Sequence, residues 1–392
     1  MIRRLVNYGY FIFLLSLIVG QLARIHLFNE AVYTYPYEIA SFLLCISLVI
    51  RHKLKPFINH KDLTRPWILF FIYLLFSLFV SLFRYSAGEN IIAGLYFARF
   101  VFYGLFIVYV LYDLCTTNRL KHIKEILALT IGLIIASSFL QFSLYPNIGN
   151  IAYLGWDPHI NRVVGAFLDP PITVSLYFLI AYIVWHTHNQ AGKYKGLCTI
   201  ALVLLAMMIT LTYSRGGFLA LGVIVLIISF QTKAFQWLLL VIMMCGIVLV
   251  LLSNSLESTN LLRTTSIASR FADYKLAYLI ARDHMFTGIG YNHIRAEKTH
   301  YETAVTVVPF NPSHSGGSFH SSFVIVAVTG GIIGLILFLS ALVKTAVMVP
   351  KVWPLIVFLS VISIFDNVLL HPLVLSLLPI SAAFSYRART RL

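Results

Sequence analysis

Apolar runs of about 20 residues recur along the whole chain, and short turns containing Lys or Arg separate most of them. A helix of this length crosses the hydrocarbon core of a bilayer, so each run is a candidate membrane span. The pattern predicts twelve spans, near residues 5–23, 34–50, 67–83, 91–114, 124–144, 170–185, 196–213, 217–231, 234–253, 320–343, 352–369 and 372–386. We therefore expect an all-α polytopic membrane protein in which residues 1–392 form a single integral membrane domain.

One long polar segment, residues 254–319, interrupts this pattern and carries six Lys or Arg and four His residues. Loops of this length are uncommon unless they have a function, so we expect this one to bind a ligand or to carry catalytic residues. Ser266 is a suitable N-cap for a helix over about residues 267–283, where aromatic residues recur at helical spacing. The sequence GIGY at residues 288–291 predicts a turn after this helix.

The composition excludes a soluble globular domain, because 59% of the residues are hydrophobic and only 11% are charged. The net charge of +15 could attract nucleic acid, but most basic residues lie in short turns, so we expect no nucleic-acid partner. The four cysteines lie far apart within or at the ends of apolar runs, which fits neither a disulfide framework nor a zinc site. Residues 1–20 resemble a signal peptide without a cleavage site and are expected to remain as the first span.

The distribution of basic residues predicts the orientation of the spans. If the N-terminus is cytoplasmic, the cytoplasmic turns hold eighteen Lys and Arg residues, whereas the short outer loops hold four. This asymmetry satisfies the positive-inside rule, so both termini are expected in the cytoplasm. The long loop, Arg215 and residues 145–169 are then expected on the extracytoplasmic side of the membrane.

Two short motifs could carry chemistry on that side. Residues 212–217, with the sequence TYSRGG, place Arg215 beside Ser214 and two glycines, where a predicted span reaches the extracytoplasmic surface of the membrane. A guanidinium group binds phosphate or pyrophosphate through paired hydrogen bonds, although Arg215 could instead only end a span by reaching into the headgroup region. Residues 316–322, with the sequence GGSFHSS, place His320 where the long loop enters a span. His320 could accept a proton at neutral pH, or it could only cap the helix or hydrogen-bond a carbonyl.

Other charged residues require partners. Arg99 lies in the middle of an apolar run, where an unpaired charge is costly, and Asp366 and Asp169 are candidate partners. Arg270 opens the predicted loop helix, and Asp273 three residues later is its expected surface partner. The glycines of the GGIIG sequence in the tenth span are expected to serve helix packing.

The chain lacks the common catalytic and metal-binding motifs. It contains no P-loop, no H-E-x-x-H or G-x-S-x-G motif and no D-x-D cluster. We therefore expect a reaction that uses no metal and no cofactor.

These motifs together resemble the O-antigen ligase/polymerase family. Residues 212–217, Arg270 before the turn at residues 288–290, and His320 before the GGIIG sequence at residues 330–334 follow one another in the order seen in that family. The layout of about twelve spans with one large periplasmic loop is also similar. The resemblance covers roughly residues 160–345.

The resemblance implies a glycosyltransferase of the inner membrane that acts, without a metal, on glycans linked to undecaprenyl pyrophosphate. Arg215 and Arg270 would hold the pyrophosphate, with Arg162 as a third cation in a loop before the sixth span. His320 would deprotonate the acceptor hydroxyl, and the anomeric centre would be inverted. The family often has Asn after this histidine, whereas Ser321 follows it here.

Fixed guanidinium groups could take the place of a metal ion in stabilising a pyrophosphate leaving group. Arg99, Ser214 and Asp366 are candidate supporting residues for this site. The acceptor could be another lipid-linked glycan, lipid A core or a protein hydroxyl, so polymerase and ligase activities both stay open.

A flippase or secondary transporter of a lipid-linked sugar is the alternative from another class. Twelve spans, an arginine (Arg99) within a predicted span and the basic charge fit a transporter. The lack of repeat symmetry between the halves and the placement of the motifs on a long outer loop count against it. A purely structural membrane protein would leave Arg99 and Arg215 unexplained.

Overall fold

The computed structural model describes residues 2–28, 32–148, 159–188, 192–233, 265–305 and 317–387. Within these ranges the chain is almost entirely helical, and seven helices are long and apolar enough to cross a membrane. They are α1 (Ile2–Val19), α4 (Lys61–Ser81), α5 (Ala87–Thr116), α6 (Arg119–Leu144), α7 (Pro170–His188), α8 (Lys195–Leu211, extended by a short turn before it) and α13 (Ser322–Met348). The remaining helices are α2 (Pro36–His52), α3 (Lys55–Asn59), α9 (Arg215–Thr232), α11 (Thr265–Asp283), α12 (Ile294–Val305), α14 (Trp353–Ser363) and α15 (Pro372–Arg387).

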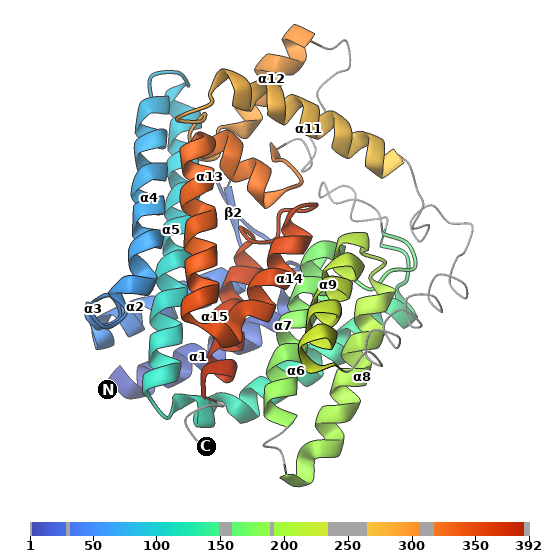
Figure 1. The fold of residues 1–392 in the computed structure, drawn as a ribbon. Helices are drawn as coiled ribbons and strands as arrows, with labels where there is room; N and C mark the ends of the chain where they lie inside the picture. The colour runs from blue at the N-terminus through green and yellow to red at the C-terminus, as the bar shows by residue number, and fades with distance from the viewer. Residues whose placement is uncertain are drawn as a thin grey trace.

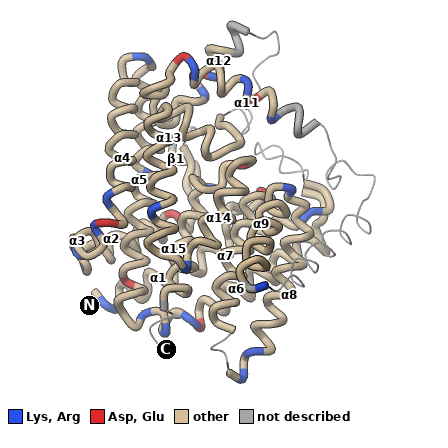
Figure 2. The backbone as a smooth tube through the Cα atoms, in the orientation of Figure 1, with Lys and Arg blue, Asp and Glu red and all other residues tan. Residues whose placement is uncertain are grey.

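The helices pack side by side into a bundle whose two ends differ (Figure 1). The beginning of α1 and the end of α15 lie at one end, and α11 and α12 lie across the opposite end. Figure 2 shows Lys and Arg mainly near the two ends, while the helical stretches between them carry few charges. This distribution is what a membrane-spanning bundle requires, because a charge in the hydrocarbon region is costly.

The predicted all-α membrane fold is therefore confirmed in general, whereas the number of twelve spans stays a prediction. The span predicted over residues 234–253 lies outside the described residues. The eleventh predicted span is too long at residues 352–369, because α14 ends at Ser363 and residues 364–370 form turns. The loop helix expected over residues 267–283 corresponds to α11, but α12 was not expected.

A small sheet that the sequence reading missed connects α1 to α2. Strands β1 (Ile25–Phe28) and β2 (Val32–Thr34) pair in antiparallel register, with Ile25 opposite Thr34. β-Branched and aromatic residues favour this extended pairing. The second strand leads directly into α2, whose first turn carries Glu38.

The loop after α11 docks onto a break in α13. Gly331 has φ 64° and ψ −170°, a conformation open to glycine but costly for other residues, and it interrupts the hydrogen bonds of α13. The carbonyls of Val328 and Thr329 accept hydrogen bonds from the backbone N–H groups of Ile289 and Gly290, both at 3.0 Å. Membrane helices tolerate such breaks only where other groups replace the lost hydrogen bonds, and the turn at residues 288–290 does so here.

The remaining glycines of the GGIIG sequence face α4, as the packing interpretation expected. A Cβ atom added to Gly330 would lie 3.0 Å from the side chain of Leu74, and one added to Gly334 would lie 3.4 Å from Tyr73. Deeper in the same interface, the buried ring of Phe70 packs against Phe338 with 5.2 Å between ring centroids. Small residues let α4 and α13 approach closely, and this contact supports the end of the bundle on which α11 rests.

Candidate active site

Helix α11 presents two site residues one turn apart on the same face. Arg270 and Asp273 are separated by three positions, so their side chains are neighbours on the helix surface. The sequence reading paired them with each other, and that prediction is wrong. Arg270 instead binds Asp366, and Asp273 binds His320 and Lys298. The packing of α11 against α12, the start of α13 and the turn after α14 provides these partners, which lie far away in the sequence.

His320 and Asp273 form a hydrogen-bonded pair. The Nδ1 atom of His320 lies 3.0 Å from Oδ2 of Asp273, and the backbone N–H of His320 donates to the same oxygen at 3.2 Å. Because an ionised carboxylate can only accept, Nδ1 carries a proton, so the tautomer that this contact selects has Nε2 as its proton acceptor. Among the described residues Nε2 has no hydrogen-bond partner, and the His320 side chain is 33% exposed.

Lys298 holds the other oxygen of the same carboxylate. Its Nζ atom donates to Oδ1 of Asp273 at 2.6 Å and to the carbonyl of Ser318 at 2.7 Å, and only 4% of its side chain is exposed. Burial alone would raise the pKa of Asp273, but the hydrogen bond from His320 and the charge of Lys298 together lower it below its usual value. The carboxylate is therefore ionised at neutral pH and can orient the imidazole.

Arg270 is held by the turn that follows α14. Its Nη2 atom lies 3.0 Å from Oδ1 of Asp366, and both side chains are mostly buried. The hydroxyl of Tyr274, one turn along α11, donates to the carbonyl of Ile364 at 3.0 Å and fixes the same turn. Within the described part of the chain, Arg270 makes no other hydrogen bond, so its Nε and Nη1 donors remain for a ligand.

The segment that carries His320 is anchored to the same turn. The hydroxyl of Ser321 caps α13 by accepting from the N–H of Val324, and it donates to the carbonyl of Ser363 at 2.9 Å. Ser322 adds a hydrogen bond to Asn367 at 3.1 Å. The interpretation of His320 as the helix cap is therefore wrong, because Ser321 serves as the cap. The imidazole is left for Asp273.

The N-terminus of α9 borders Asp366. Ser214 is the N-cap and accepts a hydrogen bond from the N–H of Gly217, which places Arg215 at the first helical position. A Cβ atom added to Gly216 would lie 3.7 Å from Oδ2 of Asp366. Tyr213, just before the cap, has a φ of 50°, an uncommon value for a bulky residue that marks a tightly constrained turn. The turn therefore brings the Arg215 backbone to the edge of the Arg270–Asp366 pair.

Arg162 lies beneath this turn. Its side chain is almost completely buried, and Nη2 donates to the carbonyl of Tyr213 at 3.0 Å. The N–H of Val163 also donates to the carbonyl of Leu211 at 2.9 Å. Gln141 in turn holds the Arg162 loop through the Arg162 carbonyl, at 3.2 Å. These contacts let Arg162 position the turn that carries Arg215, while its role as a third pyrophosphate ligand stays a prediction.

Arg99 forms an ion pair with a residue that the sequence reading did not consider. Its guanidinium donates through both Nε and Nη2 to Oε1 of Glu38, with an Nε distance of 2.9 Å. The hydroxyl of Tyr103 donates to the same oxygen at 3.1 Å. The predicted partners were therefore wrong, since Glu38 at the start of α2 satisfies the charge. Asp366 is part of the Arg270 pair.

The structure adds Asp273, Lys298 and Glu38 to the residues that the motifs singled out. The positions of Asp273 and Lys298 in polar helices gave no sign that both would be buried beside His320. No group of three or more His, Cys, Asp or Glu side chains able to hold a metal ion occurs in the ranges that the structure describes.

The fold and this site define a polytopic membrane protein with paired cationic and imidazole groups at one end of its helical bundle. Residues 200–339 match the family model described as O-antigen ligase. The predicted resemblance to the O-antigen ligase/polymerase family is thereby confirmed for this region, which includes Arg215, Arg270 and His320. The match supports a ligase- or polymerase-type function in general. No curated protein matches the chain.

Proposed function

We propose that this protein transfers a glycan from undecaprenyl pyrophosphate to an acceptor hydroxyl at the periplasmic face of the inner membrane. The observation that carries this proposal is the arrangement on α11, where one helical turn holds both the Arg270–Asp366 pair and the carboxylate that orients His320. Helix α11 thereby positions both the cation that would stabilise the leaving group, Arg270, and the general base, His320. A transfer reaction requires such fixed geometry.

The arginines act on the leaving group. Negative charge gathers on the pyrophosphate as the bond from the anomeric carbon to oxygen breaks, and a fixed guanidinium stabilises that charge in a partly buried site. Asp366 holds Arg270 in place through one nitrogen, so the remaining donors can engage phosphate oxygens. Arg215 adds a second cation at the start of α9, where the helix dipole also favours an anion.

His320 acts on the acceptor. Its Nε2 atom takes the proton of the acceptor hydroxyl as the oxygen attacks the anomeric carbon and undecaprenyl pyrophosphate leaves. Asp273 stabilises the imidazolium that forms, because its carboxylate already accepts the Nδ1 proton. Attack from the side opposite the leaving group inverts the anomeric centre. In this scheme the protein's own cations stabilise the leaving group, and the reaction is metal-independent.

The ion pair of Arg99 bears on the transporter alternative. A charged residue within a span can mark a transport pathway. Here Glu38 and Tyr103 bind the guanidinium, so the charge has a structural explanation. The transferase proposal therefore accounts for the charged residues without a transport pathway, with Arg99 serving to hold α5 against α2.

The test is a transfer assay with purified protein in proteoliposomes, with an undecaprenyl-pyrophosphate glycan as donor and EDTA present. Two acceptors are compared, a second lipid-linked glycan and lipid A core. We expect the wild-type protein to form product and Arg215→Ala, Arg270→Ala and His320→Ala to lose it. The acceptor that is used decides between polymerase and ligase. Full turnover by all three variants, or movement of the donor across the bilayer without transfer, would contradict the proposal.

A further inference from the structure

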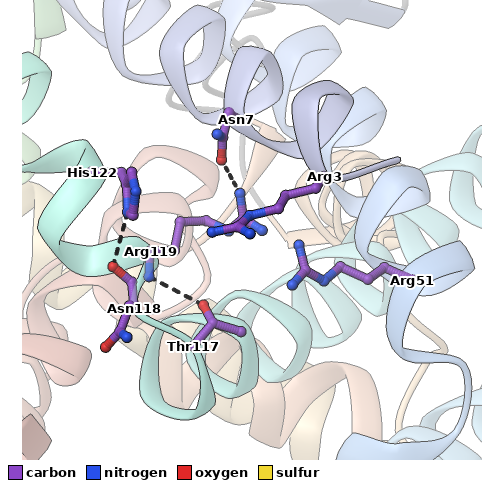
Figure 3. Close-up of a pocket in the computed structure, with 7 residues that line it drawn as sticks. All are labelled: Arg3, Asn7, Arg51, Thr117, Asn118, Arg119 and His122. Atoms are coloured by element: carbon purple, nitrogen blue, oxygen red, sulfur yellow. Dashed lines mark hydrogen bonds between the residues drawn. The ribbon is translucent and has the colours of Figure 1, made fainter. Parts of the chain in front are cut away.

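A second cationic site lies at the end of the bundle where α1 begins and α15 ends, opposite α11 (Figure 1). A cavity of about 100 Å³ opens there between the start of α1, the end of α2 and the junction of α5 and α6. Arg3, Arg51 and Arg119 line it, together with Asn7 and His122 (Figure 3). The volume has room for several water molecules or for one tetrahedral anion.

Within the part of the chain that the structure describes, three guanidinium groups line the cavity and none of the lining residues is acidic. Asp113 is fully buried beneath it and accepts hydrogen bonds from Nε of Arg119 at 2.6 Å and from Nε2 of His52 at 2.7 Å. Arg51 approaches the same carboxylate only to 3.8 Å, and its buried Nη1 atom has no hydrogen-bond partner within the described ranges. The side chain of Arg3 also reaches toward Arg119 (Figure 3). Two of the three guanidinium groups thus share the carboxylate of Asp113, and that of Arg3 has no recorded contact with it.

The local backbone adds to the attraction for an anion. Helix α6 begins at Arg119, and its first turn contains no acidic residue to offset the positive end of the helix dipole. The N–H of Arg119 already donates to the hydroxyl of Thr117 at 3.2 Å (Figure 3), so the helix contributes its dipole rather than this donor. The buried, unpartnered Nη1 of Arg51 is an independent sign that a ligand acceptor is missing, because buried donors in native proteins nearly always have a partner.

We propose that this cavity binds a phosphate group, supplied either by the headgroup of an anionic phospholipid or by free phosphate. Planar guanidinium groups suit phosphate oxygens, since they donate two hydrogen bonds in a fixed geometry. Arg3 is exposed at the first turn of α1, at the end of a candidate membrane span, where lipid headgroups are within reach. The site is distant from the Arg270–His320 site and does not depend on the proposed transfer reaction.

The test uses delipidated full-length protein in a neutral detergent and follows the midpoint of thermal unfolding. Dioleoyl phosphatidylglycerol, dioleoyl phosphatidylcholine and inorganic phosphate are titrated separately at constant ionic strength. The variants are Arg3→Gln, Arg51→Gln and their double variant. Arg4→Gln is the matched control, because it removes the same charge from an exposed neighbouring position that does not line the cavity.

We expect the wild-type protein and Arg4→Gln to be stabilised alike. Each cavity variant should bind about tenfold more weakly and the double variant about a hundredfold more weakly, as the loss of one or two charge-assisted contacts predicts. Stabilisation by phosphatidylglycerol alone would identify a lipid headgroup, whereas stabilisation by inorganic phosphate as well would show that the phosphate group suffices. The proposal would be overturned if neither phosphatidylglycerol nor inorganic phosphate stabilised the protein. It would also be overturned if Arg4→Gln weakened ligand binding as much as the cavity variants do.

Discussion

Replacing Asp273 with Asn tests whether the carboxylate beside His320 contributes to catalysis. Asn keeps the size of the side chain but removes the charge that fixes the Nδ1 proton and stabilises the imidazolium. General acid–base catalysis contributes about 10²- to 10⁴-fold in rate, which corresponds to about 3–5 kcal/mol in barrier height. We expect Asp273→Asn to lower the transfer rate by a factor in this range. The apparent KM for the lipid-linked donor should change much less, because Arg270 and Arg215 remain.

The same substitution also has a structural cost that must be separated from catalysis. The side chain of Lys298 is 4% exposed, and its ammonium group would lose its charged partner and keep only neutral ones such as the Ser318 carbonyl. Breaking a buried ion pair by removing one member costs about 3–5 kcal/mol. The double variant Asp273→Asn/Lys298→Met removes the stranded charge and should recover most of the thermal stability. It should not recover activity, because the imidazole still lacks its carboxylate.

The matched control is Asp283→Asn at the other end of α11. Asp283 is 40% exposed and pairs with Arg282, which is itself 60% exposed, so this substitution should change the transfer rate less than about twofold. All proteins are compared at equal folded concentration, judged by gel filtration and the unfolding midpoint. Retention of more than about one tenth of the wild-type rate by Asp273→Asn would refute the proposed orienting role.

Three further outcomes follow from the packing around the site. Glu38→Gln should strand the charge of Arg99 and cost about 3–5 kcal/mol, seen as a lower unfolding midpoint that the added Arg99→Met change largely restores. Gly288→Ala should cost at least about 1–2 kcal/mol from its φ of 70° alone and should speed hydrogen exchange in α11 and α12. Gly132→Ala is the control, because its Cβ meets open space within α6, and it should stabilise the protein by about 0.5–1 kcal/mol or leave it unchanged. Equal effects of the two substitutions would argue against the docking. Burial lowers the pKa of His293, which directly precedes α12. Below about pH 6.5, His293 is therefore protonated more readily when α12 is undocked than when it is docked. The docking equilibrium should weaken by up to tenfold per pH unit as the pH falls from 6.5 toward the lowered pKa. Hydrogen exchange of α12, corrected for its intrinsic pH dependence, measures this loss, and a flat profile would contradict it.

The membrane fold and the motif residues could be predicted because they depend on local sequence. Apolar runs near 20 residues predict helices wherever they occur, and α4, α5, α6 and α13 confirm this. The predicted ends were less accurate where polar residues continue a helix, as in α4, which begins at Lys61 although the apolar run begins near residue 67. A helix continues into the interfacial region as long as its hydrogen bonds are met, and the apolar pattern does not record that.

The pairing of charges could not be predicted, because it depends on which helices meet. Arg270 and Asp273 stand at a spacing that favours an ion pair within an isolated helix, a contact worth only a few tenths of a kcal/mol. Partners held by the rest of the fold compete successfully with so weak a contact. Asp366 binds Arg270 because the turn after α14 is fixed by Ser321 and Tyr274, and those contacts join parts of the chain about 40 to 90 residues apart.

The break in α13 explains how a polar helix can be held rigidly at the end of an apolar bundle. The polar face of α11 gains little from hydrophobic burial, so it needs specific anchors to keep Arg270 and Asp273 in register with His320. The turn at residues 288–290 supplies one anchor through backbone hydrogen bonds to α13. The hydroxyl of Ser77 in α4 supplies another, because its single proton lies between the carbonyls of Thr287, at 2.5 Å, and Thr329, at 2.8 Å. Helix α13 begins directly after His320 and Ser321, so its N-terminus positions the proposed base. Its break holds the turn at residues 288–290, which follows the helix that carries Asp273. One helix therefore positions both His320 and the element that carries its carboxylate partner. The register between the two then follows from the length of α13 up to its break, so a residue inserted between Ser322 and Gly331 should uncouple them more severely than one inserted after the break.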